Sequence, residues 1–290
     1  MESVIMKKKA EKWKSCISLF CFSILLIYSF SQAQEKNKEI LDIDMFAEFG
    51  FFAVLDHKVQ FGRDGTYLDY NENGGQDVLF PFTRFSIITQ LNRNIFVLLF
   101  QPLLLKTTEL IDRDLVIDDL VFLESTPVEF TYGFPFYRFS YAFDITEPDG
   151  EWDIGLGLSL QIRNATITFQ STDGELYRTN RDVGLVPLLK ALFNWRFTDN
   201  FHFGAEIDGI YAPVSYLNGD NNDVTGALID ASIRAGYVEK NKRYKIYFNL
   251  RYLAGGAQGQ SDNYEPPSDG YVKNWLNFLT VSTLFFWNIF

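Results

Sequence analysis

The chain has 290 residues, with 29 Phe, 15 Tyr and 5 Trp, and a formal net charge of −11 at pH 7. This acidic balance argues against a nucleic-acid partner, because phosphate binding depends on clustered Lys and Arg. Both cysteines lie within the first 21 residues, so the rest of the sequence has no disulfide, thiol nucleophile or Cys-bound metal.

Residues 1–33 have the pattern of a secretory signal peptide. Five lysines precede an apolar stretch at 16–30, and Ser31-Gln32-Ala33 fits a small-x-small cleavage site. We expect cleavage before Gln34. The alternative is an uncleaved membrane anchor, for which the apolar stretch is short. Removal of these five lysines and two glutamates changes the net charge from −11 to −14.

A short periplasmic segment is predicted at 34–42, followed by a membrane domain at 43–290. Its clearest element is residues 152–163, where apolar positions from Trp152 to Ile162 alternate with small or polar ones that end at Arg163. A period of two over this length predicts a β-strand with one apolar and one polar face. Such a strand, when tilted, is long enough to cross a bilayer.

Short polar turns and longer loops divide the membrane domain into five hairpins, and therefore into ten strands. The predicted strands are 43–55, 78–91, 94–105, 134–146, 152–167, 177–197, 201–213, 224–238, 244–254 and 272–290. Extended runs at 59–70 and 114–131 leave twelve strands as the alternative, but both runs carry charge on both faces. We expect an all-β fold, an antiparallel up-and-down transmembrane β-barrel.

A layer of charged side chains is predicted inside the barrel, at similar heights above the short turns. Its members are Glu48, Arg84, Arg138, Lys190, Glu206, Asp208, Asp230, Arg234 and Arg251. Five basic and four acidic groups are suited to a salt-bridge layer, because buried charges are tolerated when they are paired. The layer is interpreted either as a stabilising plug or as a constriction that selects solutes. Arg163 is expected higher, at the outer mouth, where it would meet a ligand.

The sequence offers few candidates for catalysis. His57 and His202 are its two histidines, and neither stands in an Asp-x-His or a His-x-Ser sequence. Glu206 and Asp208 share a face of one predicted strand and are candidates for a carboxylate-only site; their other interpretation is as partners for the basic residues of the layer. Residues 218–223 lack the later Glu of an EF-hand. No catalytic residue, metal site or cofactor is predicted.

The last predicted strand ends at Phe290, with Leu284 and Phe286 at matching parity. A closing strand with a terminal Phe resembles the C-terminal assembly signal of bacterial outer-membrane barrels. With the signal peptide and the alternating strands, residues 40–290 are similar to bacterial outer-membrane β-barrel proteins, without a match to a characterised subfamily. The resemblance implies export to the outer membrane, insertion by the barrel-assembly machinery, and contact with membrane lipid and lipopolysaccharide. It does not imply an activity.

Two functional hypotheses follow. The first is a non-enzymatic barrel, either a narrow channel for a small solute or a closed barrel that binds through its long loops. The alternative is an outer-membrane enzyme that acts on a lipid or surface substrate through carboxylates. Omptin proteases and outer-membrane phospholipase A use the histidine patterns that this sequence lacks. A soluble secreted β-protein is the remaining interpretation.

Overall fold

The computed structural model describes residues 41–289 except 148–149, 214–222, 241–242, 262–263, 265 and 267. The predicted signal peptide, residues 34–40 and Phe290 therefore lie outside the described residues. Within the described residues, no helix has the length and apolar character needed to cross a membrane.

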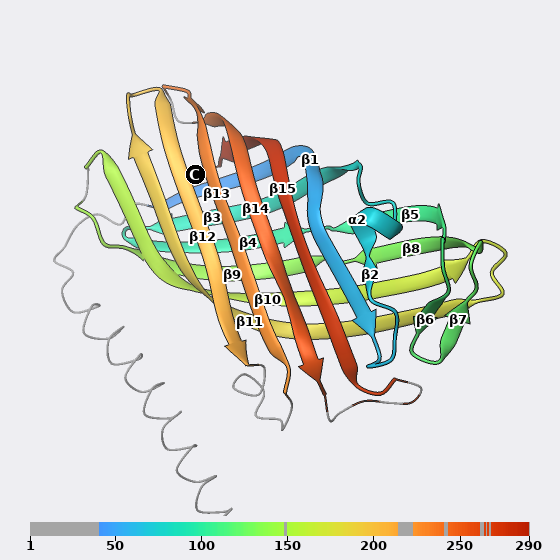
Figure 1. Ribbon diagram of the computed structural model, residues 1–290. Helices are drawn as coiled ribbons and strands as arrows, with labels where there is room; N and C mark the ends of the chain where they lie inside the picture. Colours follow the sequence, from blue (N-terminus) through green and yellow to red (C-terminus); the bar gives the residue numbers. More distant parts are fainter. Residues whose placement is uncertain are drawn as a thin grey trace, which may run out of the picture. The chain divides into compact units, whose positions relative to one another are not determined.

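Ten antiparallel strands close into a barrel (Figure 1). In ring order they are β1 (Leu41–Phe61), β3 (Leu79–Leu91), β4 (Asn94–Gln101), β9 (Phe136–Asp144), β10 (Trp152–Ser171), β11 (Tyr177–Arg196), β12 (Phe201–Pro213), β13 (Thr225–Val238), β14 (Tyr244–Gln260) and β15 (Tyr271–Asn288). The ring closes because β15 pairs with β1 and β10 with β11. The predicted all-β, up-and-down barrel is confirmed, and its strand number is ten rather than twelve.

Smaller elements extend the ring at the end opposite the short turns, which we call the outer end. There, β8 (Pro127–Gly133) pairs with the end of β10, and β5 (Leu104–Leu110) pairs with β8. A separate hairpin consists of β6 (Leu115–Ile117) and β7 (Leu120–Phe122). Next to β1 lie β2 (Leu68–Asp69) and the one-turn helix α2 (Tyr70–Asn73). The extended run at 114–131 thus lies outside the ring of ten strands, and the run at 59–70 leaves the ring after the last residues of β1.

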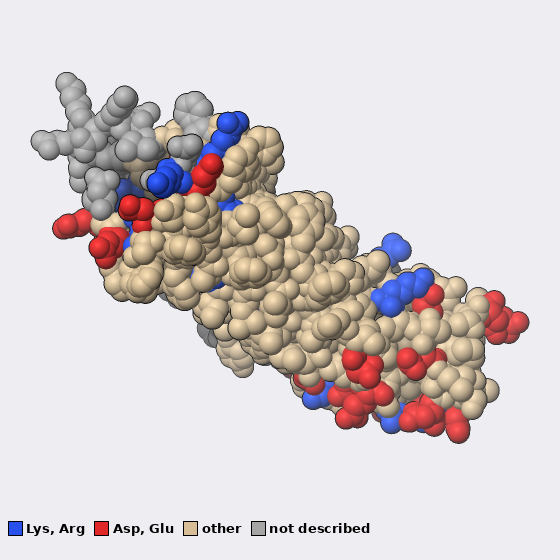
Figure 2. Space-filling model, turned by 90° about the horizontal axis from the view of Figure 1, so that it is seen from above, with Lys and Arg blue, Asp and Glu red and all other residues tan. Residues whose placement is uncertain are grey.

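An apolar belt surrounds the barrel. On β10 the outward side chains are apolar up to Ile162, and the next outward residue is Asn164. On β1 the belt ends near Leu55, beyond which Asp56 and Lys58 form an outward ion pair of 2.7 Å. Figure 2 shows this broad uncharged surface between charged groups at the two ends. A closed barrel with such a belt is a transmembrane barrel of the bacterial outer-membrane type.

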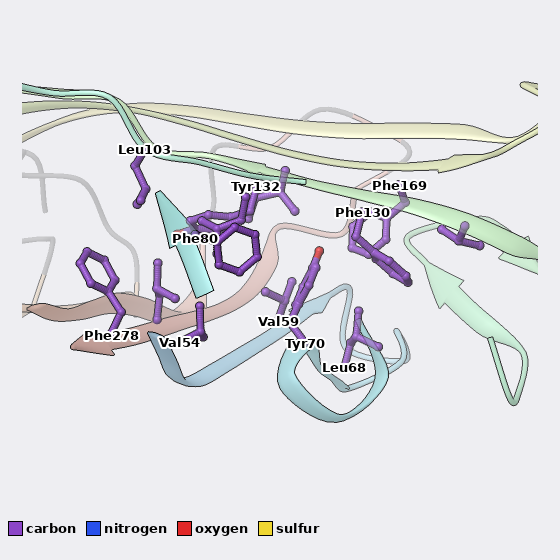
Figure 3. Packing of buried hydrophobic residues seen from close by; sticks show 14 of the residues in the cluster. Val54, Val59, Leu68, Tyr70, Phe80, Leu103, Phe130, Tyr132, Phe169 and Phe278 are labelled. Atoms are coloured by element: carbon purple, nitrogen blue, oxygen red, sulfur yellow. The ribbon is translucent and has the colours of Figure 1, made fainter. Parts of the chain in front are cut away.

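Apolar side chains fill the outer end of the lumen, beyond the belt. We call this cluster the outer core; it includes Val59, Tyr70, Phe130, Tyr132 and Phe169 (Figure 3). These residues come from β1, α2, β8 and β10, so the outer core holds the extension against the ring. All five side chains are at most 2% exposed, so the outer core is tightly packed.

A second apolar cluster, around Phe46, Leu284 and Phe286, lies at the opposite end of the lumen. The two clusters explain why β15 has apolar residues on both faces, which the sequence pattern alone left unclear. Its inward Leu276 and Phe278 belong to the outer core, whereas Leu284 and Phe286 belong to the inner cluster. The level between the two clusters holds most of the charged inward residues that the structure describes.

Candidate functional site

The charge layer spans the lumen through Arg138. This side chain extends from β9, and its Nη1 lies 2.9 Å from Asp208 Oδ2 on β12 and 2.9 Å from Asp230 Oδ2 on β13. In a ring of ten strands, β12 and β13 stand three and four neighbours away from β9. Gln161 Oε1 accepts hydrogen bonds from Nε at 3.0 Å and Nη2 at 2.6 Å of Arg138. The guanidinium is therefore fixed across the barrel.

Two further cations extend the chain of ion pairs along the wall. Lys190 Nζ on β11 lies 3.0 Å from Asp208 Oδ2 and 2.5 Å from Glu206 Oε1. Arg234 Nη1 lies 3.7 Å from Glu206 Oε2. The two carboxylates considered for catalysis are thus both bound to Lys190, inside the layer.

At the other end of the chain, Arg251 Nε donates to Asp230 Oδ1 at 3.1 Å. Seven charged residues therefore form one continuous network. In order, it runs Arg234, Glu206, Lys190, Asp208, Arg138, Asp230 and Arg251.

Glu48 and Arg84 complete the predicted layer on the opposite wall, as cross-strand partners on β1 and β3. Glu48 Oε1 accepts hydrogen bonds from Asn249 Nδ2 at 2.7 Å and from Ser282 Oγ at 2.5 Å. The Nε atom of Arg84 has no hydrogen-bond partner among the described residues. Seven of the nine predicted side chains are buried, and Glu206 and Arg234 are partly buried. The structure thus places all nine inside the barrel.

A cavity of about 470 Å³ lies one step outward from the charge layer. Ile210, Leu228 and Leu253 line it, and each lies two positions from a residue of the layer on the same strand. The opposite wall includes Phe134 and Phe136, so the lining is mainly apolar. Such a volume lies in the range of small-molecule sites.

Arg163 lines this cavity, two residues beyond Gln161 on β10. Its Nη2 is paired with a carboxylate oxygen of Asp182 on β11. Its Nε is buried and has no hydrogen-bond partner among the described residues. At Gly184 an added Cβ would come within 2.9 Å of Nε, so the absence of a side chain there lets Arg163 lie against β11. With Tyr132 and Asn274, Arg163 places polar groups in a lining that is otherwise mainly apolar.

Small residues on the wall strands make room for the cavity. Gly184 on β11, Gly226 on β13, and Gly255 and Ala257 on β14 all line it. Phe134 and Phe136 form the other part of the lining. The cavity exists because the small residues do not fill the space next to these aromatic rings. The sequence pattern predicts that this strand ends at residue 254, before the glycines at 255 and 256. Because β14 continues to Gln260, they are part of the barrel wall.

His57 lies under the outer core, at the level of the outward Asp56–Lys58 pair. Its Nδ1 is 2.7 Å from Gln76 Oε1, and its ring stacks on Tyr70 with centroids 4.5 Å apart. Tyr132 packs edge-on against the other side of the ring, with centroids 4.4 Å apart. Burial lowers the pKa of His57 to about 4, although the contacts with Gln76, Asn274 and Asp56 act in the opposite direction. Sequence reasoning found no role for this residue.

Nothing in the described part of the chain groups three His, Asp or Glu side chains as a metal site would require.

No protein-family model matches the sequence, and no curated protein matches it significantly. Similar solved structures are all distant. Ail, the attachment invasion locus protein of Yersinia pestis, in complex with the heparin analogue sucrose octasulfate, has 9% identity and a TM-score of 0.37. That match covers 85% of this chain and 99% of Ail.

Two other solved structures match a similar share of this chain. A FadL homologue of Pseudomonas aeruginosa has 10% identity and a TM-score of 0.36, over 87% of this chain and 90% of its own. The toluene transporter TodX of Pseudomonas putida has 9% identity and a TM-score of 0.31, again over 87% and 90%. At these values, the assignment of the fold rests on the closed sheet and the belt described above.

Proposed function

We propose that this protein is a plugged, non-conducting outer-membrane barrel that binds a small molecule at its outer end. The observation that carries the proposal is the position of Arg138, whose guanidinium joins β9 to β12 and β13 across the lumen. Barrels of about eight strands are filled by side chains, and ten strands lie near that limit. The inner apolar cluster supports the same interpretation, since its buried side chains occupy the other end of the lumen.

The pairing of the carboxylates favours a plug over an enzyme. Glu206 and Asp208 are neutralised by Lys190, and Asp208 also by Arg138. A general acid or base must reach a substrate, whereas these groups lie inside a packed layer and Asp208 is fully buried. We therefore place any ligand at the cavity beside Arg163, not at the carboxylates.

Planar-bilayer recordings test the plug. We expect no steady conductance from the unmodified protein, because a dry layer of paired charges excludes hydrated ions. A variant in which Arg138, Asp208 and Asp230 are all replaced by Ser should conduct, because the cross-lumen connection is removed. Replacing Arg196 and Asp153 by Ser, an ion pair that is about one third exposed, is the matched control and should stay silent. Steady conductance of the unmodified protein that changes with Arg84→Ala would identify a pore instead.

We also propose that Phe290 is an assembly signal read by the barrel-assembly machinery after a cleaved signal peptide directs export. Deletion of Phe290 should reduce the amount of protein in the outer-membrane fraction several-fold. The comparison is Ile289→Ala, which changes the neighbouring exposed side chain and keeps the terminal Phe. Equal outer-membrane levels of the deletion variant and the unmodified protein would contradict this role.

A further inference from the structure

The barrel wall is incompletely paired between β11 and β12. The ladder joining them begins at Arg196↔His202 and ends at Leu189↔Gly209. Beyond that point, β11 continues to Tyr177 while bonded to β10, and β12 continues to Pro213 while bonded to β13. Figure 1 shows β11 and β12 diverging toward their outer ends. We call residues 177–188 and 210–213 the open seam, since no described residue pairs with either on the facing side.

Pro187 fits a strand that has no partner on this side. Proline has no N–H and is therefore found in sheets on edge strands, where the missing donor faces away from the paired neighbour. Pro187 lies in the part of β11 that pairs with β10 and has no partner in the β11–β12 ladder, as expected of a proline in an edge strand. The amino acid sequence thus disfavours closure of the seam at this level.

The open seam begins within the apolar belt. Leu185 and Leu189 face outward on either side of Pro187 and are 61% and 70% exposed. Their partners on β10 are Ile162 and Leu158, which belong to the belt. Unpaired strand edges are not tolerated in contact with lipid unless they line a cavity or another chain. The seam meets this condition, because Val183, Gly184, Leu185 and Val186 line the cavity beside Arg163.

We propose that the open seam is a lateral entrance from the outer leaflet to the cavity, and that the ligand is a neutral, lipid-soluble molecule with one oxygen acceptor. The apolar lining and the aromatic wall of Phe134 and Phe136 suit an apolar body. Arg163 is already paired with Asp182, so the site has no net charge to attract an anion. Tyr132, Arg163 and Asn274 in the lining offer polar groups to an oxygen of the ligand. This proposal rests on the proposed binding role but not on the absence of conductance, which is measured separately.

Binding of 1-naphthol to the protein in lipid nanodiscs tests the cavity. We expect saturable binding at one site, with naphthalene competing about fivefold more weakly because it lacks the oxygen. Ala257→Phe, which fills the cavity, should weaken binding about tenfold or more. Ala254→Phe is the matched control, because position 254 lies on the opposite face of the same strand. Heat-modifiable migration in gels verifies that both variants fold.

Bridging the seam tests the lateral route. The described chain has no cysteine, so Pro187→Cys with Tyr211→Cys can be joined selectively by dibromobimane, two residues beyond the last pair of the ladder. Release of bound 1-naphthol into lipid vesicles should slow about tenfold after bridging, with little change in affinity. Bridging Leu158→Cys to Leu189→Cys, across the paired β10–β11 ladder, should leave release unchanged.

Two results would overturn the proposal. Unchanged release after the seam is bridged would remove the lateral entrance, even if the cavity binds. Absence of saturable 1-naphthol binding, or equal binding by Ala257→Phe, would remove the cavity as the site. In either case, the conductance measurement still tests independently whether the barrel is plugged.

Discussion

Arg138→Ala is expected to reduce the free energy of unfolding by about 3–5 kcal/mol, the cost of removing one partner from a buried ion pair. The loss is large because Asp208 and Asp230 are fully buried and both lie 2.9 Å from the same nitrogen, Nη1 of Arg138. Lys190 and Arg251 would remain, but neither reaches across the lumen to β9. Urea unfolding in detergent micelles, followed by Trp fluorescence, measures the change.

Two comparisons separate charge from packing in this experiment. Arg196→Ala, in an ion pair about one third exposed, should change the free energy of unfolding by less than about 1 kcal/mol. Combining Arg138→Met with Asp208→Asn should recover most of the stability lost in Arg138→Ala, because Lys190 keeps Glu206 and Asp230 keeps Arg251 as charged partners. A loss below about 1 kcal/mol in Arg138→Ala would show that the network does not hold the barrel together.

Acidification is expected to destabilise the outer core through His57. Because burial lowers its pKa to about 4 from the ordinary value of 6.5, the folded protein favours the neutral ring. The stability associated with the neutral ring is complete above pH 6.5 and is lost as the pH falls toward 4. The difference of about 2.5 pKa units corresponds to about 3 kcal/mol. Urea unfolding at pH 7 and pH 4 measures it.

A variant isolates the histidine from the carboxylates that also titrate at acid pH. His57→Gln keeps a group able to hydrogen-bond Gln76 but cannot be protonated, so its stability should fall about 3 kcal/mol less between pH 7 and pH 4. Limited proteolysis at pH 4 should also cleave near residues 62–67 faster in the unmodified protein, since His57 packs against Tyr70 of α2. Equal pH dependence of the two proteins would contradict this role.

The strands of the barrel wall could be predicted from the sequence, because the alternation of apolar and polar residues indicates which side chains face outward and which face inward. The run from Trp152 to Ile162 faces outward as expected, and the same parity placed all nine charged residues inside. The outer core was not foreseen. Leu115, Ile117 and Phe122 stand among charged residues, and their burial depends on packing between segments distant in the sequence.

The contacts within the charge layer depend on the shear of the barrel, which parity does not determine. A side chain's height along its own strand does not reveal that Arg138 meets strands three and four neighbours away. The open seam did leave a signal in the sequence. Pro187 lies in the middle of a predicted strand, and a proline there indicates that one side of the strand is unpaired.

The pairing of β1 with β15 has a consequence for the order of assembly. Asp44 meets Asn288 and Phe61 meets Val272, so the final closure joins segments more than two hundred residues apart. Contacts of such long range form slowly, because the chain between them must be ordered first. Until then both terminal strands expose free edges that are prone to aggregation. The time between synthesis of β15 and ring closure is therefore the period in which this barrel most needs protection by a chaperone.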